Sequence, residues 1–242
     1  MPAELAGRVA LVTGVGRVGQ VGHAVAQGLG AAGARLVLAD INVNGVADRV
    51  AEFTARGFAA HGFAGDLSTE EGARGAVAIA RQAFGGLDVV VNVAGGLVYI
   101  GPFAETPPDA FEKEFTMNVR TAFHVCRCAV PLLVERGGGA IVNFASIAVV
   151  RSIGQMASYS AAKSAVAGLT RALAREYRDA GVRVNAVAPA TIRTADNVSR
   201  MKPDPKTPLV ELDEVVGAVV FLASDAARGI TGQIVPITGK AY

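Results

Sequence analysis

Two side chains near the middle of the chain have the types and spacing that acid–base chemistry requires. Tyr159 and Lys163 lie four residues apart at the start of a run with apolar residues at helical spacing, which places the lysine one turn beyond the phenol. A phenol is a poor base near neutral pH, but a neighbouring ammonium favours the phenolate and lowers the pKa of the phenol. The pair therefore indicates a tyrosine that exchanges protons.

A second hydroxyl can join this pair. Ser146 follows the apolar run 140–145, which is typical of a buried strand. A loop from the strand to the helix could bring Ser146 beside Tyr159, so that one hydroxyl polarises a carbonyl group while the other exchanges a proton with it. Because Tyr-x-x-x-Lys also occurs by chance on amphipathic helices, the surrounding elements must support this interpretation.

The first of these elements is a short apolar strand at 8–13, followed by a glycine-rich turn and a helix of small residues. The glycines of the turn are Gly14, Gly16, Gly19 and Gly22. Glycine lets the backbone approach a phosphate, and the helix N-terminus offers free N–H groups and a favourable dipole. The pattern predicts a dinucleotide cradle, with a generic glycine turn as the alternative.

An acid then ends the second predicted strand, 35–39. Asp40 lies 18 residues after Gly22, where a dinucleotide fold places a carboxylate on the adenosine ribose and repels a 2′-phosphate. Arg17 in the glycine turn favours NADP, but Asp40 leads us to predict NAD; a helix-capping role is its alternative. Asp66 is expected either beside the adenine ring or as the cap of a helix that starts near Thr69.

The rest of the sequence alternates strand-like and helical segments. Seven strand-like runs are expected, at 8–13, 35–39, 58–63, 87–92, 139–144, 183–187 and 233–237. Helices are expected near 43–55, 69–84, 107–135 and from Tyr159 to about 180, with a last helix capped by Asp213. Pro131 should kink or end the third of these helices. This order predicts a doubly wound, Rossmann-type α/β fold: a parallel sheet of about seven strands with helices on both faces.

The predicted organisation is one domain over residues 1–242. A short, proline-rich substrate segment at about 195–208 cannot hold a long helix, which predicts an open substrate site.

Composition excludes several classes of function. The formal net charge of +2 has little to attract nucleic acid or an anionic membrane. Neither a membrane-spanning run nor a signal peptide is recognisable, so we expect a cytoplasmic protein. Cys126 and Cys128 would point to different faces of a helix, and the three histidines are scattered. We therefore predict no disulfide and no metal site.

With these residues in place, the chain resembles the short-chain dehydrogenase/reductase family along nearly its whole length. The matching elements occur in the family's order: TG with a glycine turn, the acid after the second strand, NVAG at 92–95, MNVRTAF around Asn118, Ser146, YSAAK at 159–163, and RVNAVAP at 183–189. The resemblance implies that Tyr159 is the acid/base, that Lys163 lowers its pKa and holds the nicotinamide ribose, and that Ser146 binds the substrate oxygen. Asn118, on a locally distorted helix, would hold a water that links Lys163 to solvent.

The resemblance also implies an NAD-dependent homotetramer that interconverts a small secondary alcohol and its ketone. Further cofactor contacts are implied for Asn92, Ala94, Gly95, Pro189, Ile192 and Thr194. The glycine turn is two residues longer than is usual in the family, and Val93 replaces a common asparagine. A 3-oxoacyl thioester reductase is the alternative within the class. A catalytically silent dinucleotide-binding regulator is the alternative from another class.

Overall fold

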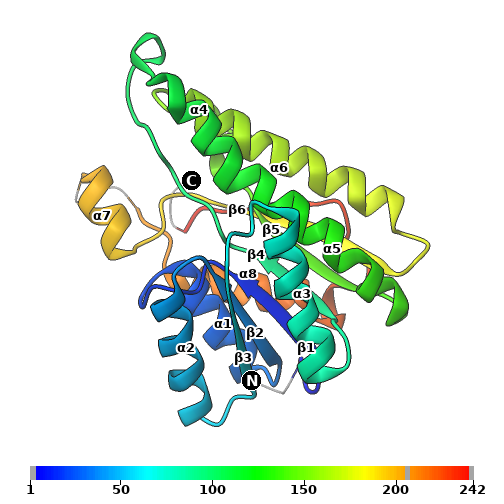
Figure 1. The fold of residues 1–242 in the computed structure, drawn as a ribbon. Helices are drawn as coiled ribbons and strands as arrows, with labels where there is room; N and C mark the ends of the chain where they lie inside the picture. The colour runs from blue at the N-terminus through cyan, green and yellow to red at the C-terminus, as the bar shows by residue number, and fades with distance from the viewer. Residues whose placement is uncertain (1–3, 205–207, 240–242) are drawn as a thin grey trace.

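The computed structural model describes residues 4–204 and 208–239. Its centre is a seven-stranded sheet in the order β3-β2-β1-β4-β5-β6-β7 (Figure 1), and every neighbouring pair is parallel. The strands are β1 (Val9–Thr13), β2 (Arg35–Asp40), β3 (Ala60–Ala64), β4 (Val89–Asn92), β5 (Gly139–Phe144), β6 (Val182–Pro189) and β7 (Ile234–Ile237). The predicted doubly wound α/β fold is confirmed.

Helices cover both faces of the sheet, which explains why the central strands are apolar without alternation. In β1, Ala10 and Val12 pack with α1 (Val21–Ala31), α2 (Val43–Ala55) and α8 (Leu212–Ala223). Val9 and Leu11, which point to the other face, pack with α3 (Glu70–Phe84), α5 (Thr121–Glu135) and α6 (Ala157–Glu176). The sheet is thus the middle layer of three.

The strand order reverses between β1 and β4. The chain first builds outward from β1 through β2 to β3, then returns to the other side of β1 and continues outward to β7. In open parallel sheets of this kind, ligands bind in the crevice outside the carboxyl ends of the strands at the reversal point. The fold therefore directs attention to the residues that follow β1, β4 and β5.

The long helix predicted over 107–135 contains one irregular turn, and its proline does not end it. It consists of α4 (Pro108–Phe115), a π-helical turn η2 (Thr116–Arg120) and α5, and Pro131 lies inside α5. Val130 and Leu133, on either side of the proline, are buried against the sheet. Their packing outweighs the local cost of the proline, so the prediction that Pro131 could end the helix is wrong.

The predicted cap of the last helix is also wrong. Asp213 lies in the first turn of α8, and the N-cap is Glu211, which forms a reciprocal capping box with Glu214. The Glu211 backbone N–H donates to Glu214 Oε2 at 2.8 Å. This box uses both long carboxylates and leaves Asp213 to complement the helix dipole.

The substrate segment contains one short helix, α7 (Ala195–Met201), as the prolines predict. Pro205 and its two following residues lie outside the described residues. Cys126 and Cys128 are free thiols. Over residues 4–204 and 208–239, no helix combines the length and apolar content needed to cross a bilayer.

Candidate active site

A cavity of about 880 Å³ opens at the carboxyl ends of β1, β2, β4, β5 and β6. It gathers residues that are far apart in the sequence. The predicted site residues on its wall are Gly14, Gly22, Asp40, Asp66, Ala94, Gly95, Ser146, Tyr159, Lys163, Pro189, Ile192 and Thr194. Four other predicted residues do not line the cavity: Gly16, Gly19, Asn92 and Asn118.

The three residues proposed for chemistry come from two adjoining elements. Ser146 follows β5 and caps a 3₁₀ turn, where its Oγ accepts a hydrogen bond from the Ala148 N–H at 3.2 Å. Lys163 Nζ donates to the carbonyl oxygen of Phe144 at 2.8 Å and lies 5.7 Å from the centroid of the Tyr159 ring. This bond fastens α6 to the end of β5, so the two hydroxyls and the ammonium share one wall.

The electrostatics of Tyr159 differ from the sequence-based expectation. Burial raises the pKa of the phenol, a hydrogen bond with Ser146 lowers it, and the charge of Glu114 raises it further. The net direction is upward because burial outweighs the polar contact. Burial also lowers the pKa of Lys163 to about 8, against the opposing charge of Glu114. In the protein alone, Tyr159 is therefore a neutral acid.

Asn118 lies beneath the cavity wall, on the π-helical turn, which confirms the expected local distortion of its helix. Its Oδ1 accepts from the Gly96 N–H at 3.1 Å, and its Nδ2 donates to the Gly96 carbonyl at 2.9 Å. A Cβ on Gly95 would lie 2.5 Å from Asn118 Oδ1, and Gly95 has a φ of +152°. Glycine is needed here because the loop passes directly over the asparagine.

The glycine turn fits a dinucleotide phosphate. A Cβ on Gly22 would lie 2.0 Å from the Gly14 carbonyl oxygen, so the first turn of α1 packs closely against the end of β1. No side chain caps α1, which leaves N–H groups of its first turn available to an anion. Gly19 is away from the cavity wall at a φ of +70°. Glycine is favoured at this position because the turn requires a left-handed backbone conformation there.

Asp40 is held in place at the end of β2. Its Oδ2 accepts from the Gly16 N–H at 2.8 Å, and its Oδ1 accepts from the Asn42 N–H at 2.9 Å. Gly16 does not line the cavity, but its N–H group helps to hold the Asp40 carboxylate on the cavity wall. Arg17, the basic residue of the turn, forms an ion pair with Asp196 of α7.

Asp66 lies on the cavity wall and does not cap α3. Its Oδ1 accepts from the Ser68 N–H at 2.8 Å. The N-cap of α3 is Thr69, whose side chain accepts from the Gly72 N–H. The capping alternative for Asp66 is therefore wrong, and its place beside the adenine ring stays a prediction.

Asn92 points away from the cavity. Its Nδ2 donates to Asn143 Oδ1 at 2.8 Å and to Cys126 Sγ at 3.3 Å, and Asn143 donates in turn to Thr170. Side chains alternate along a strand, so Asn92 faces α5 as Val90 does. The asparagine joins β4 to β5 and α6 through this chain of contacts, and its side chain does not reach the cavity.

Sequence reasoning missed two residues behind and beside this wall. Glu114 is fully buried one helical turn before Asn118, and Arg200 of α7 lines the cavity. The spacing of Glu114 and Asn118 equals that of Tyr159 and Lys163, which is the sequence signal that could have identified the glutamate.

Comparisons with known proteins agree with this geometry. A family model described as enoyl-(acyl carrier protein) reductase matches residues 14–239. The 2,3-dihydroxy-2,3-dihydro-p-cumate dehydrogenase of Pseudomonas putida is 35% identical, over 97% of this chain and 94% of the relative. A cyclohexanol dehydrogenase of an Acinetobacter species is 34% identical, over 96% and 94%. The solved structure of a short-chain type dehydrogenase/reductase from Mycobacterium ulcerans superposes with a TM-score of 0.91 at 32% identity, over 98% of this chain and 90% of that one.

Proposed function

Because this chain belongs to the short-chain dehydrogenase/reductase family, it is an oxidoreductase acting on CH–OH groups, and we propose that it interconverts a secondary alcohol and its ketone with NAD. The observation that carries the proposal is the shared cavity wall of Ser146, Tyr159 and Lys163. Both relatives described above are named as dehydrogenases of alcohols, one of a cyclohexanol and one of a dihydroxy compound. These names support a small alcohol as the substrate.

In this proposal, the protein orients the substrate oxygen and moves one proton. Ser146 Oγ and the Tyr159 hydroxyl both bind that oxygen. In ketone reduction the neutral phenol of Tyr159 donates its proton to the oxygen, and in alcohol oxidation the phenolate removes it. Lys163, fixed by the Phe144 carbonyl, presents its positive charge to the phenol and to the ribose hydroxyls. A bound nicotinamide supplies the hydride chemistry.

The cofactor would extend along the cavity between the glycine turn and this wall. Gly14, Gly22 and the first turn of α1 would hold the pyrophosphate. Ala94 and Gly95 follow β4, Pro189 ends β6, and Ile192 and Thr194 follow it, so these five residues would enclose the nicotinamide end. All these groups belong to one sheet, which supports our reading of residues 1–242 as a single functional domain.

Two observations support NAD over NADP. Asp40 lines the cavity at the end of β2, where a carboxylate would repel a 2′-phosphate, and the competing cation, Arg17, forms an ion pair with Asp196. Replacing Asp40 by alanine should reduce the ratio of NAD to NADP affinity by about tenfold, the size of one like-charge repulsion at a partly exposed site. Fluorescence titration with both dinucleotides measures this ratio. An unchanged ratio would remove Asp40 from the ribose site.

The family resemblance also leads us to propose a homotetramer. Large apolar side chains are exposed on the helices that would meet in it: Phe111 on α4, Phe123 on α5 and Phe221 on α8. Such residues are typical of buried subunit contacts. Light scattering on purified protein would give about four times the chain mass of 24.7 kDa; a monomer mass would refute this assembly.

A turnover screen tests the proposed function directly. The panel contains cyclic and acyclic secondary alcohols, their ketones and 3-oxoacyl thioesters, each with NAD or NADP in the matching redox state. Turnover restricted to thioesters would favour the 3-oxoacyl reductase. Dinucleotide binding without turnover of any compound would favour the silent regulator. The matched inactive control is Tyr159→Phe.

A further inference from the structure

Glu114 is a fully buried carboxylate immediately behind the proposed catalytic wall. It belongs to α4, one turn before Asn118, and its exposed fraction is 0%. Burying a carboxylate without partners is strongly unfavourable, so a chain normally places one in its interior only with hydrogen bonds or countercharges. Glu114 takes no part in the proposed proton transfer, so its contacts must account for its burial.

The first set of contacts fixes the loop that follows β4. Glu114 Oε1 accepts from the Val98 N–H at 2.7 Å, with a longer contact to the Tyr99 N–H at 3.5 Å. Its Oε2 accepts from Asn118 Nδ2 at 3.2 Å, while the same Nδ2 bonds the Gly96 carbonyl. The carboxylate and the asparagine thus anchor the loop at 96–99, whose residues Gly96 and Leu97 line the cavity.

The same loop is held from its other side by the substrate segment. Arg200 of α7 donates to the Leu97 carbonyl oxygen at 2.8 Å and to the Val98 carbonyl oxygen at 3.4 Å. Glu114 therefore binds the loop through N–H groups and Arg200 binds it through carbonyl groups. The helix α7 projects from the body of the sheet (orange in Figure 1), and this contact joins it to the buried carboxylate through three loop residues.

Charge provides the second link to the site. The titratable groups whose charges act on Glu114 or feel its charge are Lys163 and Tyr159 from α6 and Arg200 from α7. Tyr99 of the loop contacts the carboxylate only through its backbone N–H group. The pKa of Glu114 is raised, because burial outweighs the N–H donors of Val98 and Tyr99 and the charges of Lys163 and Arg200, all of which lower it. In return, the negative charge of Glu114 raises the pKa of Lys163 against the burial that lowers it.

We propose that Glu114 is a positioning residue of this active site, whose carboxylate anchors the substrate-facing loop 96–99 through Val98 and Asn118 and supplies a negative charge to the surroundings of Lys163. The inference rests on the function proposed above, because it assigns Lys163 a charged role. Glu114 touches neither substrate nor cofactor in this account. It acts through Asn118, the loop and the field at Lys163.

The charge is tested by Glu114→Gln, which keeps the shape and an acceptor oxygen for the loop. Ketone reduction needs both a neutral Tyr159 and a charged Lys163, so its kcat/KM falls as Lys163 loses its proton. Because the carboxylate raises the pKa of Lys163, its removal should move this falling limb to lower pH by about one unit, as expected for charges in a partly screened interior. The matched control is Glu112→Gln on the exposed side of the same helix, which should leave the limb in place.

The anchor is tested by Glu114→Asp, which keeps the charge but shortens its reach by one methylene. The expected result is a rise of about fivefold in KM for the ketone, the scale of one weakened hydrogen bond, with an unchanged dinucleotide Kd. An unchanged KM would overturn the proposal even if Glu114→Gln yielded no folded protein. The proposal would also be overturned if the falling limb of the pH profile were the same in Glu114→Gln as in the wild type.

These outcomes are separable from failure of the proposed function. If wild-type protein reduces a ketone and Tyr159→Phe does not, the proposed function stands whatever Glu114 does. If Tyr159→Phe turns over as the wild type does, the catalytic assignment fails, and the role given to Glu114 fails with it.

Discussion

The two ends of the sheet carry hollows of similar size and opposite character. The active-site cavity at the carboxyl ends measures about 880 Å³, and a cleft at the amino ends of β1, β4, β5 and β6 measures about 830 Å³. We call the second the arginine cleft. Its arginines are Arg8, Arg136, Arg171, Arg175, Arg178, Arg183 and Arg228, and its acids are Asp88 and Asp225.

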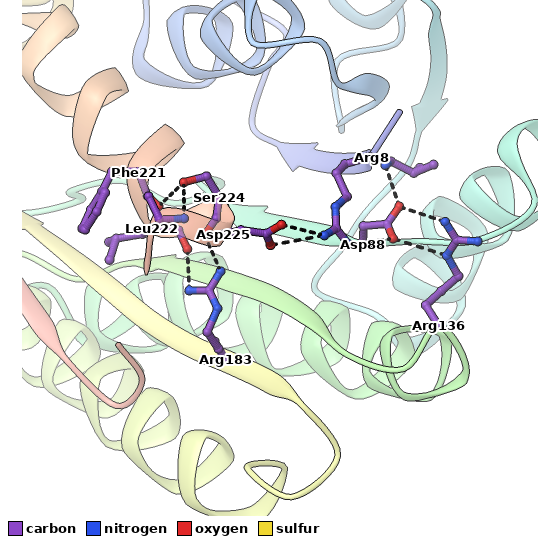
Figure 2. A network of polar contacts seen from close by, with 10 residues as sticks. Arg8, Asp88, Arg136, Arg183, Phe221, Leu222, Ser224 and Asp225 are labelled. Carbon is purple, nitrogen blue, oxygen red and sulfur yellow. Dashed lines mark hydrogen bonds and ion pairs between the residues drawn. The ribbon is translucent and has the colours of Figure 1, made fainter. Parts of the chain in front are cut away.

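The polar groups at the centre of the arginine cleft bond one another and the backbone (Figure 2). Asp88 is 3% exposed; its Oδ2 accepts from the Val9 N–H at 2.8 Å, and Arg136 approaches both of its oxygens at 3.3 and 3.4 Å. Arg183 donates to the carbonyls of Leu222 and Ser224. These bonds join β1, α5, β6 and the end of α8.

The active-site cavity differs because its walls include two hydroxyl groups and an ammonium, of Ser146, Tyr159 and Lys163, with no guanidinium or carboxylate of the described residues directly bonded to them. Tyr159 and Lys163 have perturbed pKa values, whereas the acids of the arginine cleft are compensated by adjacent guanidinium groups. A cluster of charged side chains therefore indicates catalysis only where neighbouring side chains do not already compensate its charges. We therefore expect substitutions in the cavity to affect turnover and substitutions in the cleft to affect stability.

The largest expected effect is on catalysis at the cavity. Tyr159→Phe should lower kcat/KM for the best alcohol by about 10²- to 10⁴-fold, the usual contribution of a general acid or base. Its thermal midpoint should stay within a few degrees of the wild type. Steady-state kinetics and calorimetry measure the two quantities. Near-full turnover in this variant would disprove the assignment and, with it, the contrast between the two ends.

A substitution at the centre of the cleft should give the opposite pattern. Asp88→Ala leaves the Val9 N–H and the Arg136 guanidinium without their acceptor, so we expect a loss of about 3 kcal/mol in the free energy of unfolding. The folded fraction should retain wild-type kcat/KM. Urea denaturation measures the stability change. Asp225, whose side chain is 83% exposed, supplies the control, and Asp225→Ala should cost well under 1 kcal/mol.

The pH dependence of the wild-type protein sharpens the contrast. Because burial lowers the pKa of Lys163 to about 8, the kcat/KM for ketone reduction should fall as pH rises through that value. Tyr159 cannot cause this fall, since burial keeps the phenol protonated there. A pH series in a constant-ionic-strength buffer locates the limb. Constant activity up to pH 10 would show that the charge on Lys163 is not needed.

The smallest effect is expected at the rim of the arginine cleft. The side chains of Arg171, Arg175, Arg178 and Arg228 make no ion pair or hydrogen bond with any residue in the described part of the chain. Arg175→Gln should therefore change the free energy of unfolding by no more than about 0.5 kcal/mol. Chemical denaturation at low and high salt provides the measurement. A larger loss would reveal a contact made outside the single chain.

The sequence predicted most of the fold because strand and helix periodicity, glycine turns and strand-end acids are local signals. Ser146, Tyr159, Lys163 and Asp40, all predicted from the sequence, line the cavity. What could not be predicted depends on tertiary burial: the upward pKa of Tyr159, the inward turn of Asn92 and the buried Glu114. The cap of α8 was ambiguous for a different reason, since Glu211, Asp213 and Glu214 are all acids within one helical turn.

The π-helical turn at Thr116–Arg120 lets one additional residue fit into the long helix without rotating its two halves relative to each other. A π turn accommodates about one residue more than an α turn. In a regular α-helix, the same additional residue would rotate everything beyond it by about 100°. Because the π turn absorbs this residue, Glu114 and Asn118 face the loop while Val125 and Ala129 face the sheet. Deleting one residue there should therefore keep both faces of the helix and remove the irregular backbone that carries Asn118.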